Sequence, residues 1–96
     1  MDEMEILVQS IGLNAVSSIG KDKLHALEVT LNGETGDTRI AVTLHDESED
    51  EILRATEKLA DLQILFLGEV SIRWSFEEAG SRVRTVLATE KQYSYV

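Results

Sequence analysis

Two runs of alternating apolar and polar side chains flank one dense turn, and this arrangement constrains the fold of the chain most strongly. The turn, Asn32-Gly33-Glu34-Thr35-Gly36-Asp37, is rich in residues that accept tight backbone bends. Alternation with a period of two is typical of strands that bury one face. Leu24–Leu31 and Thr38–His45 are therefore predicted to pair as an antiparallel hairpin. The apolar positions are Leu27, Val29 and Leu31 before the turn, and Ile40, Val42 and Leu44 after it.

A helix is predicted directly after the hairpin, where five carboxylates occupy the six residues Asp46–Glu51. Ser48 is a favourable N-cap, and Glu51 stands three residues later, where a capping box places its carboxylate. Acidic residues in a first turn also complement the positive end of the helix macrodipole. Apolar residues at helical spacing then predict a helix from about Glu49 to about Leu62. Four carboxylates of this run are kept as a secondary partner-binding hypothesis: Asp46, Glu47, Glu49 and Asp50.

Two strands are expected after the helix. Ile64–Phe76 is long for a single strand, and Gly68 is expected to bend it. Beyond this glycine, apolar and polar side chains alternate again. The turn Glu77–Gly80 then leads into a last strand, from about Ser81 to Glu90.

The N-terminal residues 5–13 predict a first strand with a bulge at Gly12, followed by a loop at Asn14–Lys23. The order is then β-β-β-α-β-β in a single domain that covers residues 1–96, since no linker or repeat divides the chain. The fold class is α+β, with one helix packed on one face of a mostly antiparallel, mixed five-stranded sheet. A right-handed crossover through the helix makes the two strands it joins parallel, which agrees with a strand order of 3-2-1-4-5.

The composition and charge of the chain limit which partners it can bind and in which compartment it is expected. The net charge of −9 disfavours direct binding to nucleic acid or to an anionic membrane, because both are polyanions. No apolar stretch approaches the roughly 20 residues that span a bilayer. The acidic N-terminus does not resemble a secretory signal, so a cytoplasmic protein is expected. Cysteine is absent, which excludes disulfides and thiolate chemistry.

The only two histidines, His25 and His45, are candidate metal ligands, and the register of the hairpin decides whether their side chains face each other. Pairing Leu27 with Leu44 sets Ala26 opposite His45 and sends the two imidazoles to opposite faces. The serines lack the sequence context of a hydrolase triad, and the glycines match no phosphate-binding loop. We therefore expect no catalytic, cofactor-binding or metal-binding residues and no cofactor.

One cluster of cations favours binding instead of catalysis. If Glu77–Gly80 is a hairpin turn, Arg73 lies across from Arg84, and Arg82 lies nearby on the face without a helix. Arginine suits bidentate contacts to carboxylates and is enriched at binding hot spots. The predicted partner-binding residues are Arg73, Arg82 and Arg84. The alternative is a solvated sheet face on which they pair with acidic neighbours.

These observations predict a small acidic protein that is not an enzyme and acts by binding another, possibly basic, protein. It would serve as an inhibitor, an immunity-type protein or an accessory subunit. The sheet edges also allow a homodimer. The alternatives are a small enzyme or ligand-binding domain without a recognisable motif, and an inhibitor that mimics the charge of nucleic acid.

Overall fold

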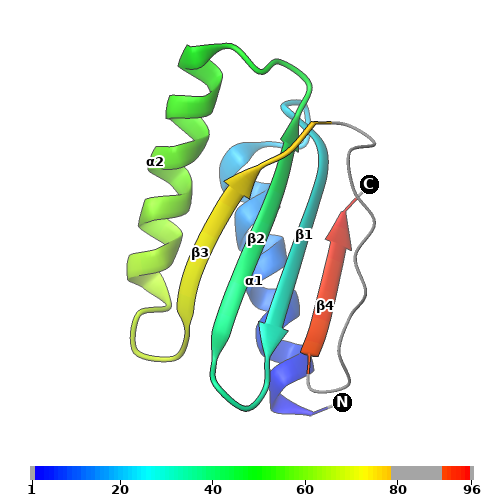
Figure 1. The fold of residues 1–96 in the computed structure, drawn as a ribbon, viewed down its shortest axis with the longest axis vertical. Helices are drawn as coiled ribbons and strands as arrows, with labels where there is room; N and C mark the ends of the chain where they lie inside the picture. The colour runs from blue at the N-terminus through cyan, green and yellow to red at the C-terminus, as the bar shows by residue number, and fades with distance from the viewer. Residues whose placement is uncertain (1, 79–89, 96) are drawn as a thin grey trace.

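The computed structural model describes residues 2–78 and 90–95, and it confirms an α+β fold with a mixed sheet. Within these residues the sheet has four strands in the order β3-β2-β1-β4, where β3 is parallel to β2 and the other neighbours are antiparallel (Figure 1). The described elements are α1 (Glu3–Ile19), β1 (Leu24–Asn32), β2 (Asp37–Leu44), α2 (Glu49–Leu65), β3 (Ser71–Phe76) and β4 (Glu90–Tyr95).

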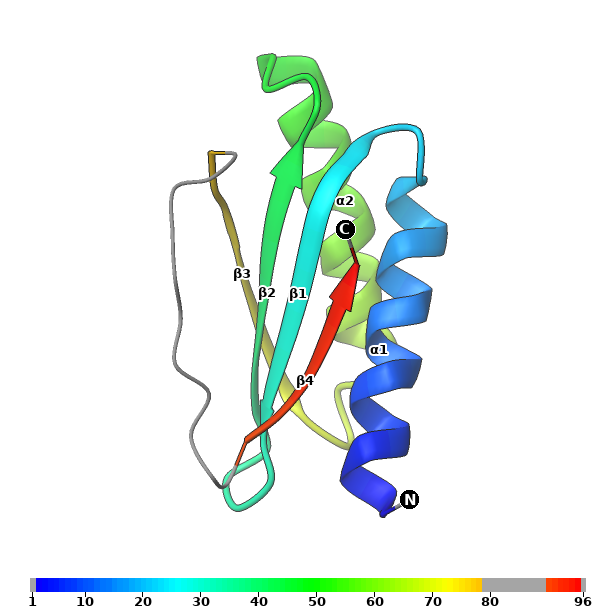
Figure 2. The same ribbon diagram turned by 90° about the vertical axis from the view of Figure 1, so that its right-hand side faces the viewer.

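Both helices cover the same face of the sheet and run in opposite directions (Figure 2). The core lies between this helix layer and the sheet, and it includes Ile11 and Ile19 of α1 together with Leu59 of α2. On β1 and β2 the apolar residues that face the helices are buried, and on β3 and β4 side chains such as Trp74 and Tyr93 are half-buried against them. Residues on the other face of the sheet are mainly polar. The single-faced core that the alternating pattern predicts is therefore present, but two helices cover it instead of one.

The prediction of a strand at residues 5–13 was wrong, because this segment lies within α1. Residues four apart on α1, such as Ile11 and Ala15, are buried along one side of the helix. Asp2 caps the helix, since its carboxylate accepts a hydrogen bond from the Glu5 backbone N–H at 2.8 Å. That hydrogen bond lowers the pKa of Asp2 below its ordinary value of 3.8, and the nearby Lys91 ammonium adds to the effect. Gly12 is a buried helical residue and not a strand bulge.

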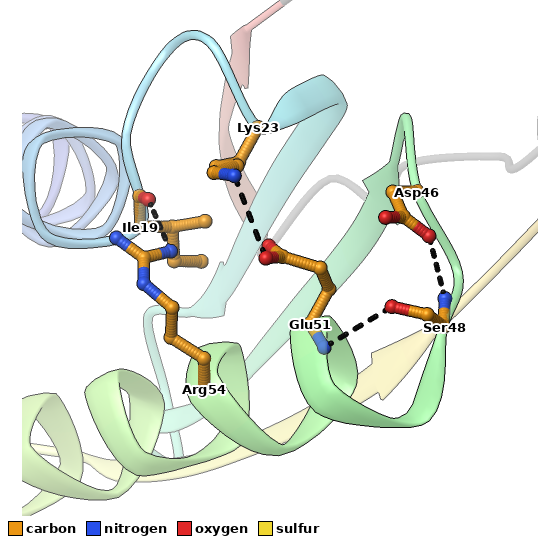
Figure 3. A network of polar contacts seen from close by, with 6 residues as sticks. All are labelled: Ile19, Lys23, Asp46, Ser48, Glu51 and Arg54. Carbon is orange, nitrogen blue, oxygen red and sulfur yellow. Dashed lines mark hydrogen bonds and ion pairs between the residues drawn. The ribbon is translucent and has the colours of Figure 1, made fainter.

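Helix α2 begins at Glu49 as predicted, and its Ser48 cap is confirmed. The predicted capping-box role of Glu51 is wrong, because the Glu51 carboxylate pairs with the Lys23 ammonium at 3.4 Å. Asp46 takes its place, and its carboxylate accepts the Ser48 backbone N–H at 2.9 Å (Figure 3). Asp46, which was predicted only as a secondary partner-binding residue, thus stabilises the start of the helix.

The chain after Leu62 also differs from the prediction. Helix α2 continues to Leu65, and a turn that includes Gly68 then leads to β3 at Ser71. The predicted strand Ile64–Phe76 therefore contains the end of a helix, a turn and a strand. Its apolar start resembles a buried strand in composition, but Ile64 and Leu65 are exposed on the helix surface.

The hairpin of β1 and β2 is confirmed, with a register shifted by two residues from the expected one. Leu27 pairs with Val42 instead of Leu44, so the same side chains still face the core. Gly36 adopts a φ of 78°, the left-handed conformation that this turn requires. The parallel arrangement of the strands joined by α2 is also confirmed.

The strand order differs from the predicted 3-2-1-4-5, in which residues 5–13 were counted as the first strand. The strand after α2, β3, lies beside β2, and the last described strand, β4, pairs with β1. Except for Glu90, the predicted strand from Ser81 lies outside the described residues, as does the second half of the turn Glu77–Gly80. The antiparallel pairing predicted between these strands is therefore not part of the described structure.

Candidate binding surfaces

Two hollows follow each other along the line where α1 and α2 face one another. One, of about 430 Å³, is lined by Glu3, Met4, Ile6, Leu7 and Ser10 of α1, with Phe66 and Glu69 after α2. The other, of about 340 Å³, is lined by Asn14 and Ser18 of α1 and by Lys58, Asp61, Leu62 and Leu65 of α2. Ser10 and Asn14 lie about one turn apart on α1. The two hollows are therefore treated together as the interhelical groove.

Large apolar side chains in and beside this groove are exposed. Ile6 on α1 is 55% exposed, and Leu65 at the end of α2 is 65% exposed. Leu67, in the turn after α2, is 71% exposed. Isolated exposed apolar residues are common, but exposed apolar residues that line a concave surface, as Ile6 and Leu65 do, are a feature of interaction sites. Covering the interhelical groove would therefore remove the exposed Ile6 and Leu65 side chains from water.

The rim of the groove is mainly acidic. Glu3 and Glu69 flank the first hollow, and Asp61 lines the second. Lys58 is the one cation among the described residues that line these hollows. A groove with apolar walls and an acidic rim favours an apolar segment that carries positive charge at its margins.

A separate hollow of about 570 Å³ lies on the other side of α1, toward β4. Its described lining consists of Leu13, Val16, Ser17, Lys21, Tyr93 and Tyr95. The two tyrosines pack partly against the core and so contribute to the fold. This hollow has a basic residue on its rim instead of an acidic set, which distinguishes it from the interhelical groove.

Of the predicted arginine cluster, only Arg73 lies among the described residues; Arg82 and Arg84 lie outside them. Because β3 pairs with β2, the neighbour of Arg73 is Arg39. Both arginines are exposed on the face without helices, and no ion pair to either is found within the described structure. Arg39 alternates with the core residues of β2, which was the signal that could have predicted its place on this face.

The secondary acidic hypothesis concerned the start of α2. Glu49 and Asp50 are exposed in the first helical turn, and Asp46 and Glu47 are exposed just before it. Glu47 lines a hollow of about 290 Å³ with Leu44, Ile52, Phe76, Glu77 and Glu78. A basic partner could contact this end of the molecule, but local structure already accounts for Asp46 and for the first-turn acids.

The predicted homodimer would form by pairing between edge strands of two copies of the sheet. Strands β3 and β4 form the two edges of the described sheet. On β3, the side-chain amide of Gln63 donates a hydrogen bond to the Ile72 carbonyl at 2.8 Å, which satisfies one outward-facing group. Partial coverage of this kind makes a strand less ready to accept another chain. Homodimer formation stays a prediction.

The two histidines lie together, contrary to the expectation that they face apart. Their ring centroids are 5.3 Å apart, and the ring planes meet at 82°. The cause is an irregularity of register between Leu24 and Ala26, which places an extra residue, His25, in β1. Regular alternation cannot predict this arrangement, because a bulge reverses the face on which a side chain lies.

Comparison with family models, with curated proteins and with solved structures finds no match for this chain. Function must therefore be argued from the surfaces themselves. In the part of the chain that the structure describes, no helix is long and apolar enough to cross a membrane. No group of three or more His, Cys, Asp or Glu side chains is placed to hold a metal ion in this same part.

The interhelical groove was not predicted from the sequence. Its α1 side was missed because residues 5–13 were interpreted as a strand. On the α2 side, Lys58, Asp61 and Leu62 lay in the predicted helix, but Leu65, Phe66 and Glu69 were placed in the predicted strand that begins at Ile64. The available signal was the persistence of helical spacing beyond Gly12, through Ala15 and Ile19, which a strand does not explain.

Proposed function

We propose that this protein is not an enzyme and acts by binding another protein through the interhelical groove. The observation that carries the proposal is the exposure of Ile6 and Leu65 along a concave surface between α1 and α2. Covering such apolar surface contributes about 25 cal/mol for each Å² removed from water. The role is that of an inhibitor, an immunity-type protein or an accessory subunit, all of which act by occupying a partner.

The chemistry of the groove defines the partner segment. Its apolar walls suit large aliphatic or aromatic side chains, and its acidic rim suits lysine or arginine at the margins. A groove between two helices is well shaped for an amphipathic helix, whose apolar residues recur at every third or fourth position. We therefore assign the groove to a basic amphipathic helix of another protein. The overall charge of −9 favours the encounter with such a segment.

The proposal is tested by photo-cross-linking in native host cells. A photoreactive phenylalanine analogue replaces Leu65 in one variant and Leu53 in the other, since both leucines lie on α2 and are similarly exposed, at 65% and 59%. Position 65 should cross-link one partner, and the attached peptide should be amphipathic and basic. Position 53 should give no such product.

Equal cross-linking from both positions would contradict the assignment of the groove. An attached peptide that is acidic or uniformly polar would contradict the proposed chemistry of the partner.

The arginines supply a second candidate surface for the same function. Arg39 and Arg73 are neighbouring exposed cations, which would suit an acidic partner segment. An Arg39→Ala, Arg73→Ala variant separates the two surfaces. If the groove is the binding site, this variant keeps its affinity for the cross-linked partner. Loss of affinity would move the site to the face without helices.

A further inference from the structure

The His25 and His45 side chains occupy one small area at the end of the hairpin. His25 lies in β1 at the irregularity of register, and His45 directly follows β2. The backbone beside them is fixed, because the His45 N–H donates a hydrogen bond to the Lys23 carbonyl at 3.0 Å. Both side chains are exposed. An incoming ion can therefore reach both rings without opening the core.

The spacing of the rings matches that of two ligands on one tetrahedral ion. A zinc–nitrogen bond is about 2.0–2.1 Å long, and an imidazole nitrogen lies about 1.1 Å from the ring centre. Two such ligands at a tetrahedral angle therefore have ring centroids about 5.2 Å apart. The observed separation is 5.3 Å.

The orientation of each ring can change at little cost. The axis of the Cβ–Cγ bond passes close to the ring centre, so rotation about it turns the nitrogens while the centroids stay in place. For histidine this torsion has broad energy wells. The edge-to-face arrangement, with ring planes at 82°, can thus change without altering the spacing.

We propose that His25 and His45 form a two-histidine site for a divalent transition-metal ion such as Zn²⁺. Neutral imidazole is the protein ligand most widely used by Zn²⁺, Cu²⁺ and Ni²⁺. Water fills the remaining coordination positions, because no third His, Cys, Asp or Glu completes a metal-binding group among the described residues.

The charged groups near the pair do not oppose the ion strongly. The nearest cation along the chain, Lys23, directs its ammonium to the Glu51 carboxylate at 3.4 Å. Asp46 follows His45 directly, and the protein carries a net charge of −9. A negative protein raises the local concentration of cations. This electrostatic environment supports binding, while the two imidazoles provide the selectivity for transition metals.

The test is a zinc titration of untagged protein, followed through the imidazole signals in NMR spectra. The chain has two histidines and no cysteine, so the side chains most likely to compete for zinc are absent. Both rings should shift together and saturate at one zinc per protein. His25→Gln and His45→Gln should each weaken binding about tenfold or more, because one ligand is lost. Circular dichroism checks that both variants fold, as the exposure of these side chains predicts.

Three results would overturn the proposal. One is the absence of a ring shift at millimolar zinc, and another is a shift of only one ring. The third is unchanged affinity in either glutamine variant, which would assign the bound zinc to carboxylates such as those of Asp46–Glu51. A variant in which Glu47 and Glu49 are replaced by glutamine is the control, and it should keep the zinc affinity of the original protein.

Discussion

Gly12 of α1 lies directly against the side chain of Tyr93 on β4. A Cβ atom at this position would overlap the ring of Tyr93 on β4. Glycine is normally unfavourable inside a helix, by about 1 kcal/mol relative to alanine. Here the missing side chain makes room for an aromatic ring, so packing outweighs helix propensity.

We expect Gly12→Ala to lower the free energy of unfolding by about 1 kcal/mol, because overpacking costs about 1–3 kcal/mol and exceeds the gain in helix propensity. In a Tyr93→Ala background the same change should instead stabilise the protein by about 1 kcal/mol. Urea unfolding of the four proteins measures this double-mutant cycle. The same sign in both backgrounds would show that Tyr93 is not the cause.

The neighbours Asp46 and Glu47 provide a matched test at the start of α2. Asp46→Ala should cost about 1 kcal/mol, because the Ser48 N–H loses its acceptor. Asp46→Asn keeps an acceptor oxygen and should cost less. Glu47→Ala removes an equal charge, and the stability should change by less than about 0.5 kcal/mol. Equal losses for Asp46→Ala and Glu47→Ala, measured by urea unfolding, would contradict this role of Asp46.

The roles of single residues were predicted correctly only where they depend on neighbours in the sequence. Ser48 was identified as a cap because the preference for serine there depends on a few adjacent residues. The actual partners of Glu51 and Gly12 were not predictable, since Lys23 and Tyr93 approach them from distant parts of the chain. The histidine pair was missed for a related reason: strict alternation contains no information about a bulge.

At the level of elements, a long-range hydrogen bond connects α2 to the end of α1. The Arg54 guanidinium on α2 donates a hydrogen bond to the Ile19 carbonyl at the end of α1, at 3.0 Å (Figure 3). Carbonyls in the last turn of a helix lack partners within the helix, and a cation there also complements the macrodipole. Arg54 therefore stabilises the end of α1 and holds the helices together.

Arg54→Met should lower the free energy of unfolding by about 1 kcal/mol, because the stem remains but the hydrogen bond is lost. Lys58→Met changes the net charge equally on the same exposed helix surface and should have an effect below about 0.5 kcal/mol. Thermal or urea unfolding provides the comparison. An equal loss in the two variants would assign the effect to net charge instead of the contact.

Elements with a strong period were predicted well, whereas α1 was not. The hairpin and the start of α2 combine clear periodicity with clear end signals. In α1, the run Ile6–Val8 is apolar on consecutive positions, which is also typical of a buried strand. Asp2 is the N-cap of this helix, but from the sequence the acidic N-terminus was interpreted only as evidence against a secretory signal.

At the scale of the whole molecule, two helices on one face of the sheet create a groove that one helix could not. Their facing surfaces leave Ile6 and Leu65 exposed beside Glu3, Asp61 and Glu69. Part of the negative charge of the protein therefore lies on the rim of the interhelical groove. The function in protein binding and the assignment of the groove are proposals that rest on this location.

The affinity of the cross-linked partner for two serine variants tests the central claim most directly. Leu65→Ser should weaken binding about 30-fold, as expected for a hot-spot residue worth about 2 kcal/mol. Leu53→Ser makes the same change on the same helix and should alter affinity less than about twofold. Isothermal titration calorimetry with the purified partner measures both. Retained affinity in Leu65→Ser, or equal losses in the two variants, would contradict binding through the interhelical groove.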